Sequence, residues 1–269
     1  MPTELLLVLS GLGAGTFGAM LGLGGGILIV PILTLGFGVP LTAAVGTSLV
    51  CVIATSTGAA AVNVRAGRAD VRLGITLGAA TVVGAASGGI LAGFLPERIL
   101  AGLFAALLVY TALTMLRSLR GTAAGDSDGH AVDPTAPDGP GAPAYRTHRL
   151  PAAWAGSLVA GHASGLLGVG GGIVSVPLIR VLMQAPMRVA VATSNFMIGI
   201  TAAAGAAAYL FRGEIDPRQA APVVIGVTLG AALGAGIAAR LRPAWLTGLF
   251  VLVVGYVAVR MALRALGAE

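Results

Sequence analysis

The chain of 269 residues is 57% hydrophobic and only 10% charged, with a mean hydropathy of +0.95. A soluble domain of this length carries charge on about a quarter of its residues, so a soluble globular fold is excluded. All 16 basic residues are arginines, and the net charge is +6 at pH 7. Without a lysine, a Walker-type phosphate loop is excluded as well. We interpret the arginines as cytoplasmic anchors of membrane loops and not as a nucleic-acid surface.

Eight apolar stretches follow one another along the chain, and most are close to the roughly 20 residues that a helix needs to cross a bilayer. They are Leu5–Phe37, Val39–Val62, Leu73–Leu95, Ile99–Leu116, Ala152–Met183, Val189–Phe211, Gln219–Ala239 and Ala244–Leu263. The pattern predicts an all-α polytopic membrane protein with about eight transmembrane segments. The first and fifth stretches are too long, because about 33 helical residues span roughly 50 Å against a hydrocarbon core of about 30 Å.

Each of the two long stretches contains a glycine cluster with a proline five residues after it. The clusters read GLGGG from Gly22 to Gly26 and GVGGG from Gly168 to Gly172. The similarity continues beyond them, since 16 of the 45 positions from Gly18 to Val62 are identical to those 146 residues later. Glycine lowers helix propensity and proline removes a helical hydrogen bond, so we expect both stretches to break near the membrane midplane.

This internal duplication defines the predicted domain organisation. Two homologous four-segment repeats occupy residues 1–120 and 148–269. Between them, residues 121–147 are rich in Gly, Ala, Pro and Asp and carry almost no large apolar side chain. We predict that this segment is a disordered cytoplasmic linker.

The arginines fit two topologies equally well. If each long stretch crosses the membrane once, eleven arginines lie on the cytoplasmic side with both termini and the linker, and five lie outside. If each long stretch instead dips in and returns as a re-entrant hairpin, the repeats are inverted. The split is again eleven to five, but both termini then lie outside. We prefer the single crossing because it needs fewer special features, while the charges leave both topologies open.

The duplicated glycine clusters are the candidate binding site. Backbone N–H groups freed at a helix break can hold an anion without any charged side chain, and transporters with internal repeats use such breaks. The alternative is that the glycines only allow close helix packing. Hydroxyls of the next stretch could donate to the same anion or simply bond between helices. The predicted substrate-binding residues are Gly24, Gly25, Gly26, Thr47, Ser48, Gly170, Gly171, Gly172, Thr193, Ser194 and Asn195.

His162 is the one titratable residue expected well inside a span. We consider it as a proton-coupling group, with a structural histidine as the alternative. The sequence contains neither a Ser/His/Asp set nor Cys/His metal spacing, so we expect no enzyme, no cofactor and no metal. The expected partners are a small anion and the lipid bilayer, without nucleic acid. A homodimer is left open by the sequence.

Taken together, these motifs resemble the TauE/SafE family of membrane proteins, also described as sulfite exporters or toluene-sulfonate uptake permeases. The matching residues are Gly22 to Gly26, Pro31, Thr47, Ser48, Gly168, Gly170 to Gly172, Pro177, Thr193 and Ser194. The second half departs from the first at Ala192, which stands where the first has Gly46. The resemblance does not explain the acidic linker.

The resemblance implies a secondary transporter in the bacterial inner membrane that works without ATP. Its substrates would be small sulfur-containing anions such as sulfite, sulfoacetate or other organosulfonates. We expect export, but the resemblance fixes neither the substrate nor the direction, because the family moves several anions both ways. Two alternatives remain from the residues themselves. One is a passive anion channel, and the other is a membrane adaptor or assembly subunit that acts through the linker.

Overall fold

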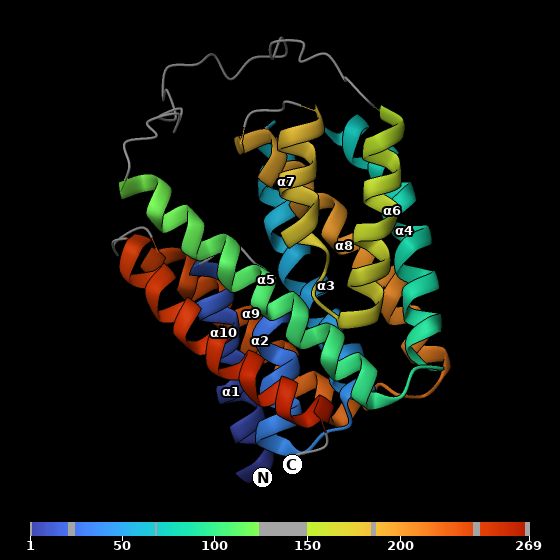
Figure 1. Cartoon of the computed structure of the whole chain (residues 1–269), viewed down its shortest axis with the longest axis vertical. Coiled ribbons are helices and arrows are strands. Elements are labelled where there is room, and N and C mark those ends of the chain that lie inside the picture. Colours follow the sequence, from blue (N-terminus) through green and yellow to red (C-terminus); the bar gives the residue numbers. More distant parts are fainter. Residues whose placement is uncertain are drawn as a thin grey trace.

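The computed structural model describes residues 2–20, 25–67, 69–123, 150–183, 187–238 and 243–266. The elements in these ranges are helices (Figure 1). They are α1 (Pro2–Met20), α2 (Gly26–Pro31), the π-helical turn η1 (Ile32–Gly36), α3 (Leu41–Arg65), α4 (Val71–Ala92), α5 (Glu97–Ala123), α6 (Leu150–Leu167), α7 (Gly172–Met183), α8 (Met187–Phe211), α9 (Pro217–Ala238) and α10 (Pro243–Leu266). The predicted linker lies outside the described residues, except for 121–123 at the end of α5.

The helical class expected from composition is confirmed. Four helical ranges among the described residues are long and apolar enough to cross a membrane, namely Leu41–Arg65, Val71–Ala92, Glu97–Thr114 and Val189–Phe211. Two shorter apolar helices, Thr3–Ala19 and Gly26–Gly36, come from the first long stretch. That stretch is therefore not one straight span.

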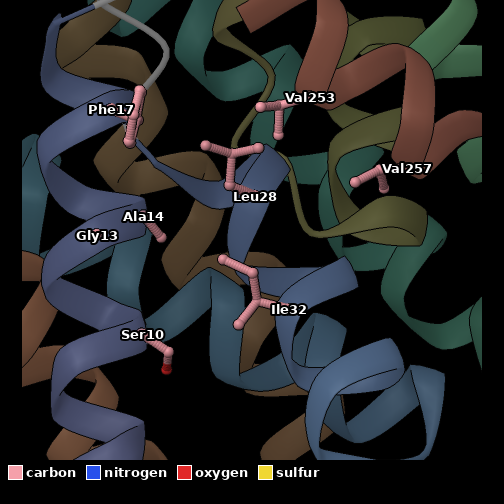
Figure 2. A pocket seen from close by; sticks show the side chains of 8 residues that line it. All are labelled: Ser10, Gly13, Ala14, Phe17, Leu28, Ile32, Val253 and Val257. Atoms are coloured by element: carbon pink, nitrogen blue, oxygen red, sulfur yellow. The ribbon is translucent and has the colours of Figure 1, made fainter. Parts of the chain in front are cut away.

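Both long stretches break at their glycine clusters, as predicted. α1 ends at Met20 before α2 begins, and α6 ends at Leu167 before α7 begins at Gly172. After each break the chain turns back: Leu28 lies near the level of Phe17, and Ile32 lies lower along α1, towards Ser10 (Figure 2). We call α1 to η1 the first hairpin and α6–α7 the second hairpin, and the glycine segments their tips.

The second hairpin has the same antiparallel arrangement. Gly171 lies against Ser164 near the end of α6, whereas Leu178, two turns further along α7, lies against Gly156 near its beginning. In each hairpin the chain thus returns towards the end from which it came. Pro31, at the end of α2, is followed directly by the π-helical turn η1.

Helices of the first half pack along helices of the second. α1 runs beside α9, and α4 runs beside α6, with glycines at both contacts (Figure 1). A Cβ built on Gly230 would lie 2.2 Å from the carbonyl oxygen of Leu12, and one on Gly84 would lie 2.1 Å from that of Leu158. Small residues let membrane helices approach this closely. Gly84 and Gly230 therefore serve close helix packing.

The directions of the paired helices distinguish the two predicted topologies. α3 and α8 are antiparallel, because Gly46 lies against Tyr209 while Gly199 lies against Ser56. α5 and α10 are antiparallel too, since Glu97 at the start of α5 pairs with Arg264 near the end of α10 at 3.0 Å. Had each long stretch crossed the membrane once, these corresponding helices would run parallel. The single crossing that we preferred from the sequence is therefore wrong, and the hairpin alternative fits.

Polar side chains close the helix ends. Asp70 caps α4 by accepting the N–H of Leu73 at 2.9 Å. At the other end of α4, Arg212 donates to the carbonyl oxygens of Gly89 and Ile90 and pairs with Glu214 at 3.0 Å. Helix termini carry unsatisfied backbone groups, and these contacts satisfy some of them.

Candidate functional site

The two hairpin tips have the same local geometry. Gly25 has φ +79° and Gly171 has φ +77°, the left-handed conformation that favours glycine. The carbonyl oxygen of Gly25 accepts the N–H groups of Leu28 and Ile29. The carbonyl oxygen of Gly171 accepts those of Val174 and Ser175, which are the corresponding residues of the second half. The N···O distances of these four bonds are 3.0–3.3 Å. Glycine is needed here because these tight turns begin the returning helices. Gly24, also predicted to bind substrate, lies outside the described residues.

The tips meet inside the molecule at Ser48 of α3. Its hydroxyl oxygen lies 2.8 Å from the carbonyl oxygen of Gly168 and 3.1 Å from that of Gly26, so it can donate to either tip. Ser48 is completely buried. The two glycine clusters therefore lie close together, and Ser48 is the residue that links them.

Two apolar side chains fill the space beside the tips. Val52 lies against Gly26 and Gly170, where its methyl groups would be 2.8 and 2.6 Å from an added Cβ. Ile198 lies against Gly170 and Gly172. These two residues are counterparts in the internal duplication, 146 positions apart. Neither residue could be predicted from the sequence, because an apolar residue in an apolar stretch carries no signal of its own.

The other predicted hydroxyls have different surroundings. Thr193 accepts the N–H of Asp70 at 3.0 Å, so it holds the loop that leads into α4. Thr47 is buried, and Asn195 is half-buried on the same helix as Thr193. Ser194 is completely buried, and its hydroxyl has no hydrogen-bond partner in the described part of the chain. Ser194 therefore offers a buried hydroxyl that no other described residue uses.

His162 lies away from the tips. Its Nδ1 is 3.0 Å from the hydroxyl oxygen of Ser87, an exposed residue of α4. Gly171 instead contacts Ala160 and Ser164, which share the other face of α6. The structure does not bring His162 together with the predicted anion-binding residues.

Ser164 lies beside the second tip and is not among the residues predicted from the sequence. It is 2% exposed, and its hydroxyl has no hydrogen-bond partner among the described residues. The hydroxyl oxygen would lie 3.6 Å from a Cβ built on Gly171. Its counterpart in the first half is Gly18. The sequence does contain a signal for Ser164: beside a duplicated motif, a serine replaces the glycine of the other half, so the two halves differ in polarity there.

A cavity of about 300 Å³ lies elsewhere, between α1, α2 and α10 (Figure 2). It is lined by Ser10, Gly13, Ala14, Phe17, Leu28, Ile32, Val253 and Val257. The lining is apolar, and the hydroxyl of Ser10 is turned to the carbonyl oxygen of Leu7 at 2.8 Å. This cavity offers nothing to an anion and lies outside the predicted site.

Fold and site together define a class of protein: a polytopic helical membrane protein whose two broken-helix hairpins meet in its interior. Residues 7–261 match the family described as "Sulfite exporter TauE/SafE". The chain belongs to this family, as the sequence motifs indicated. Membership implies a multi-pass membrane transporter and not an enzyme.

Individual relatives agree with this assignment. The chain is 29% identical over 245 residues to the "Probable membrane transporter protein YunE" of Bacillus subtilis, covering 88% of this chain and 89% of the relative. It is 31% identical over 211 residues to a probable membrane transporter protein of Methanocaldococcus jannaschii, covering 76% and 72%. The family is thus represented in a bacterium and an archaeon. No solved structure matches the chain.

Proposed function

We propose that this protein is a secondary transporter, acting as an exporter, of small sulfur-containing anions such as sulfite, sulfoacetate or other organosulfonates. The observation that carries the proposal is the meeting of both glycine tips at Ser48. Non-helical backbone at membrane depth is tolerated where it is buried in protein or lines a cavity, and transporters bind substrate at such breaks. The family description supports sulfur oxyanions as the substrate class.

The proposed topology is a pair of inverted repeats in the cell membrane. The first hairpin enters from outside and the second from the cytoplasm, and the linker is cytoplasmic. Antiparallel packing of α3 on α8 and of α5 on α10 supports this arrangement. With hairpins, eleven arginines fall on the cytoplasmic side and five outside, which agrees with the preference of arginine for cytoplasmic loops.

The positions of the Val52 and Ile198 side chains indicate how access to the tips is blocked in such a transporter. They fill the space against the tips, so an anion reaches the tips only after these side chains move apart. Rocking of one hairpin and its partners against the other would expose the tips to each side in turn. This supports saturable transport over a permanently open channel.

Transport by purified protein in liposomes tests the proposal. Vesicles loaded with labelled sulfite or sulfoacetate should release it down its gradient, with a rate that saturates as concentration rises. Protein-free vesicles give the background leak. A flux that never saturates would favour a passive channel, and absence of flux across a panel of sulfur anions would refute the substrate class.

A further inference from the structure

We infer that the anion is bound at only one of the two tips, the second, by the hydroxyls of Ser164 and Ser194 together with the first turn of α7. This inference rests on the proposed transport function and goes beyond it. The duplicated sequence suggests two equivalent sites, whereas the structure gives the tips unequal polar groups.

The serines of α3 and α8 show the first difference between the tips. Ser48 donates to the carbonyl oxygens of Gly26 and Gly168, so its hydroxyl is used within the protein. Its counterpart Ser194 is equally buried but has no partner in the part of the chain that the structure describes. A buried hydroxyl without a partner costs free energy, and a bound ligand would remove that cost.

The second difference is Ser164. Its hydroxyl is also unpartnered within the described residues, and it lies beside Gly171, where α7 begins. In the first half a glycine, Gly18, occupies the corresponding position and offers no donor. The second tip therefore has two unused hydroxyls, and neither has a free equivalent at the first tip.

The start of α7 supplies further donors. α7 is twelve residues long, and Gly170 and Gly171 before it both have positive φ. The N–H groups of Val174 and Ser175 donate to the carbonyl oxygen of Gly171, and the first N–H groups of a helix have no acceptor within the helix itself. Free N–H groups and the positive end of the helix dipole favour negative charge.

Ser194 shares a face of α8 with Ile198. It lies one turn before Ile198, and Ile198 contacts Gly172, the first residue of α7. Ser164 approaches from α6 on the side of Gly171. The tip is thus flanked by the Ser164 hydroxyl and by the face of α8 that carries Ser194, and the apolar side chains of Val52 and Ile198 fill the space beside it.

The donors are neutral, and this defines the ligand chemistry. Hydroxyl and backbone N–H groups match the oxygen atoms of a compact sulfite or sulfonate group. In a site of low dielectric constant they bind such oxygens more strongly than in water. We expect one anion per protein molecule.

Sulfite transport by single variants tests the site. Ser164→Ala and Ser194→Ala should each raise the KM for sulfite about ten-fold, because each removes a hydrogen bond to a charged group. Ser157→Ala is the matched control, since Ser157 lies on the same face of α6, is 1% exposed and has an equally unpartnered hydroxyl. It lies two turns from Ser164, and its KM should equal that of the wild type.

Thermal unfolding of the same proteins in detergent separates binding from folding. Without sulfite, Ser164→Ala and Ser194→Ala should be at least as stable as wild type, because neither hydroxyl has a partner to lose. Sulfite should stabilise the wild type and the Ser157→Ala variant, and this stabilisation should be reduced in the other two.

Wild-type KM and wild-type stabilisation by sulfite in both variants would overturn the single site while the transporter stands. Failure of the wild-type protein to move sulfite or sulfoacetate would instead overturn the proposed function, and the site with it. A measured stoichiometry of two anions per chain would also contradict the inference.

Discussion

At the scale of single residues, glycines in this chain have two separate roles. Gly25 and Gly171 have positive φ, and an added Cβ would meet its nearest atom only at 3.5 and 3.4 Å. Gly84 and Gly230 lie within helices, where a Cβ would collide with the backbone of a neighbouring helix. The first kind is needed for conformation and the second for close packing, so alanine should affect them differently.

Alanine at the tips should reduce transport more than folding. A Cβ at positive φ costs about 1–2 kcal/mol, so Gly25→Ala and Gly171→Ala should fold and insert with a modest loss of stability. Shifting the tip should weaken anion binding, most strongly for Gly171→Ala, since the second tip holds the proposed site. Sulfite uptake at matched membrane abundance measures this. Wild-type transport by both variants would show that transport does not depend on the tip geometry that these glycines allow.

Alanine at the helix contacts should act on stability. Gly84→Ala should lower the free energy of unfolding by about 1–3 kcal/mol, because its Cβ would overlap the Leu158 carbonyl. Gly78→Ala is the control on the same helix, since its Cβ would meet only the Met197 side chain, at 4.0 Å. That substitution should be neutral or stabilise by about 0.5–1 kcal/mol, as alanine does within helices. Equal unfolding temperatures for the two variants would show that α4 and α6 are not in close contact.

At the scale of elements, the broken helices could be predicted and their directions could not. The glycine clusters and the excess length of two apolar stretches predicted where α1 and α6 end. Arginine counts could not show that α2 and α7 turn back, because both topologies give the same split of eleven to five. The directions became clear only from long-range contacts such as Glu97 with Arg264.

Side-chain direction explains why the sequence did not show which residue of α6 lies at the second tip. His162 and Ser164 are two residues apart, and they point to opposite faces of α6. His162 was the predicted candidate because a histidine side chain can carry a proton, yet it faces Ser87 of α4. Ser164 was not predicted, although it faces Gly171. Only the neighbours of each face of α6 show which of the two residues lies beside the tip.

At the scale of the whole molecule, the inverted arrangement predicts which side of the membrane each terminus occupies. In a Cys51→Ala background, Glu4→Cys should react with an impermeant maleimide added to intact cells, because the amino terminus lies outside. Asp128→Cys in the linker should react only after the cells are permeabilised. Both topologies place the linker inside, so it serves as the internal control. Protection of the cysteine at position 4 in intact cells would restore the single-crossing topology.

The inferred site places a sulfur oxyanion inside the protein at the start of α7. Selenite, the heavier analogue of sulfite, makes this directly measurable, because selenium scatters anomalously. A crystal soaked in selenite should show one anomalous peak per chain, next to Gly171 and between the hydroxyls of Ser164 and Ser194, with Val52 or Ile198 displaced from its present position. A peak at the first tip, equal peaks at both tips, or selenite only at arginines on the surface would contradict the account.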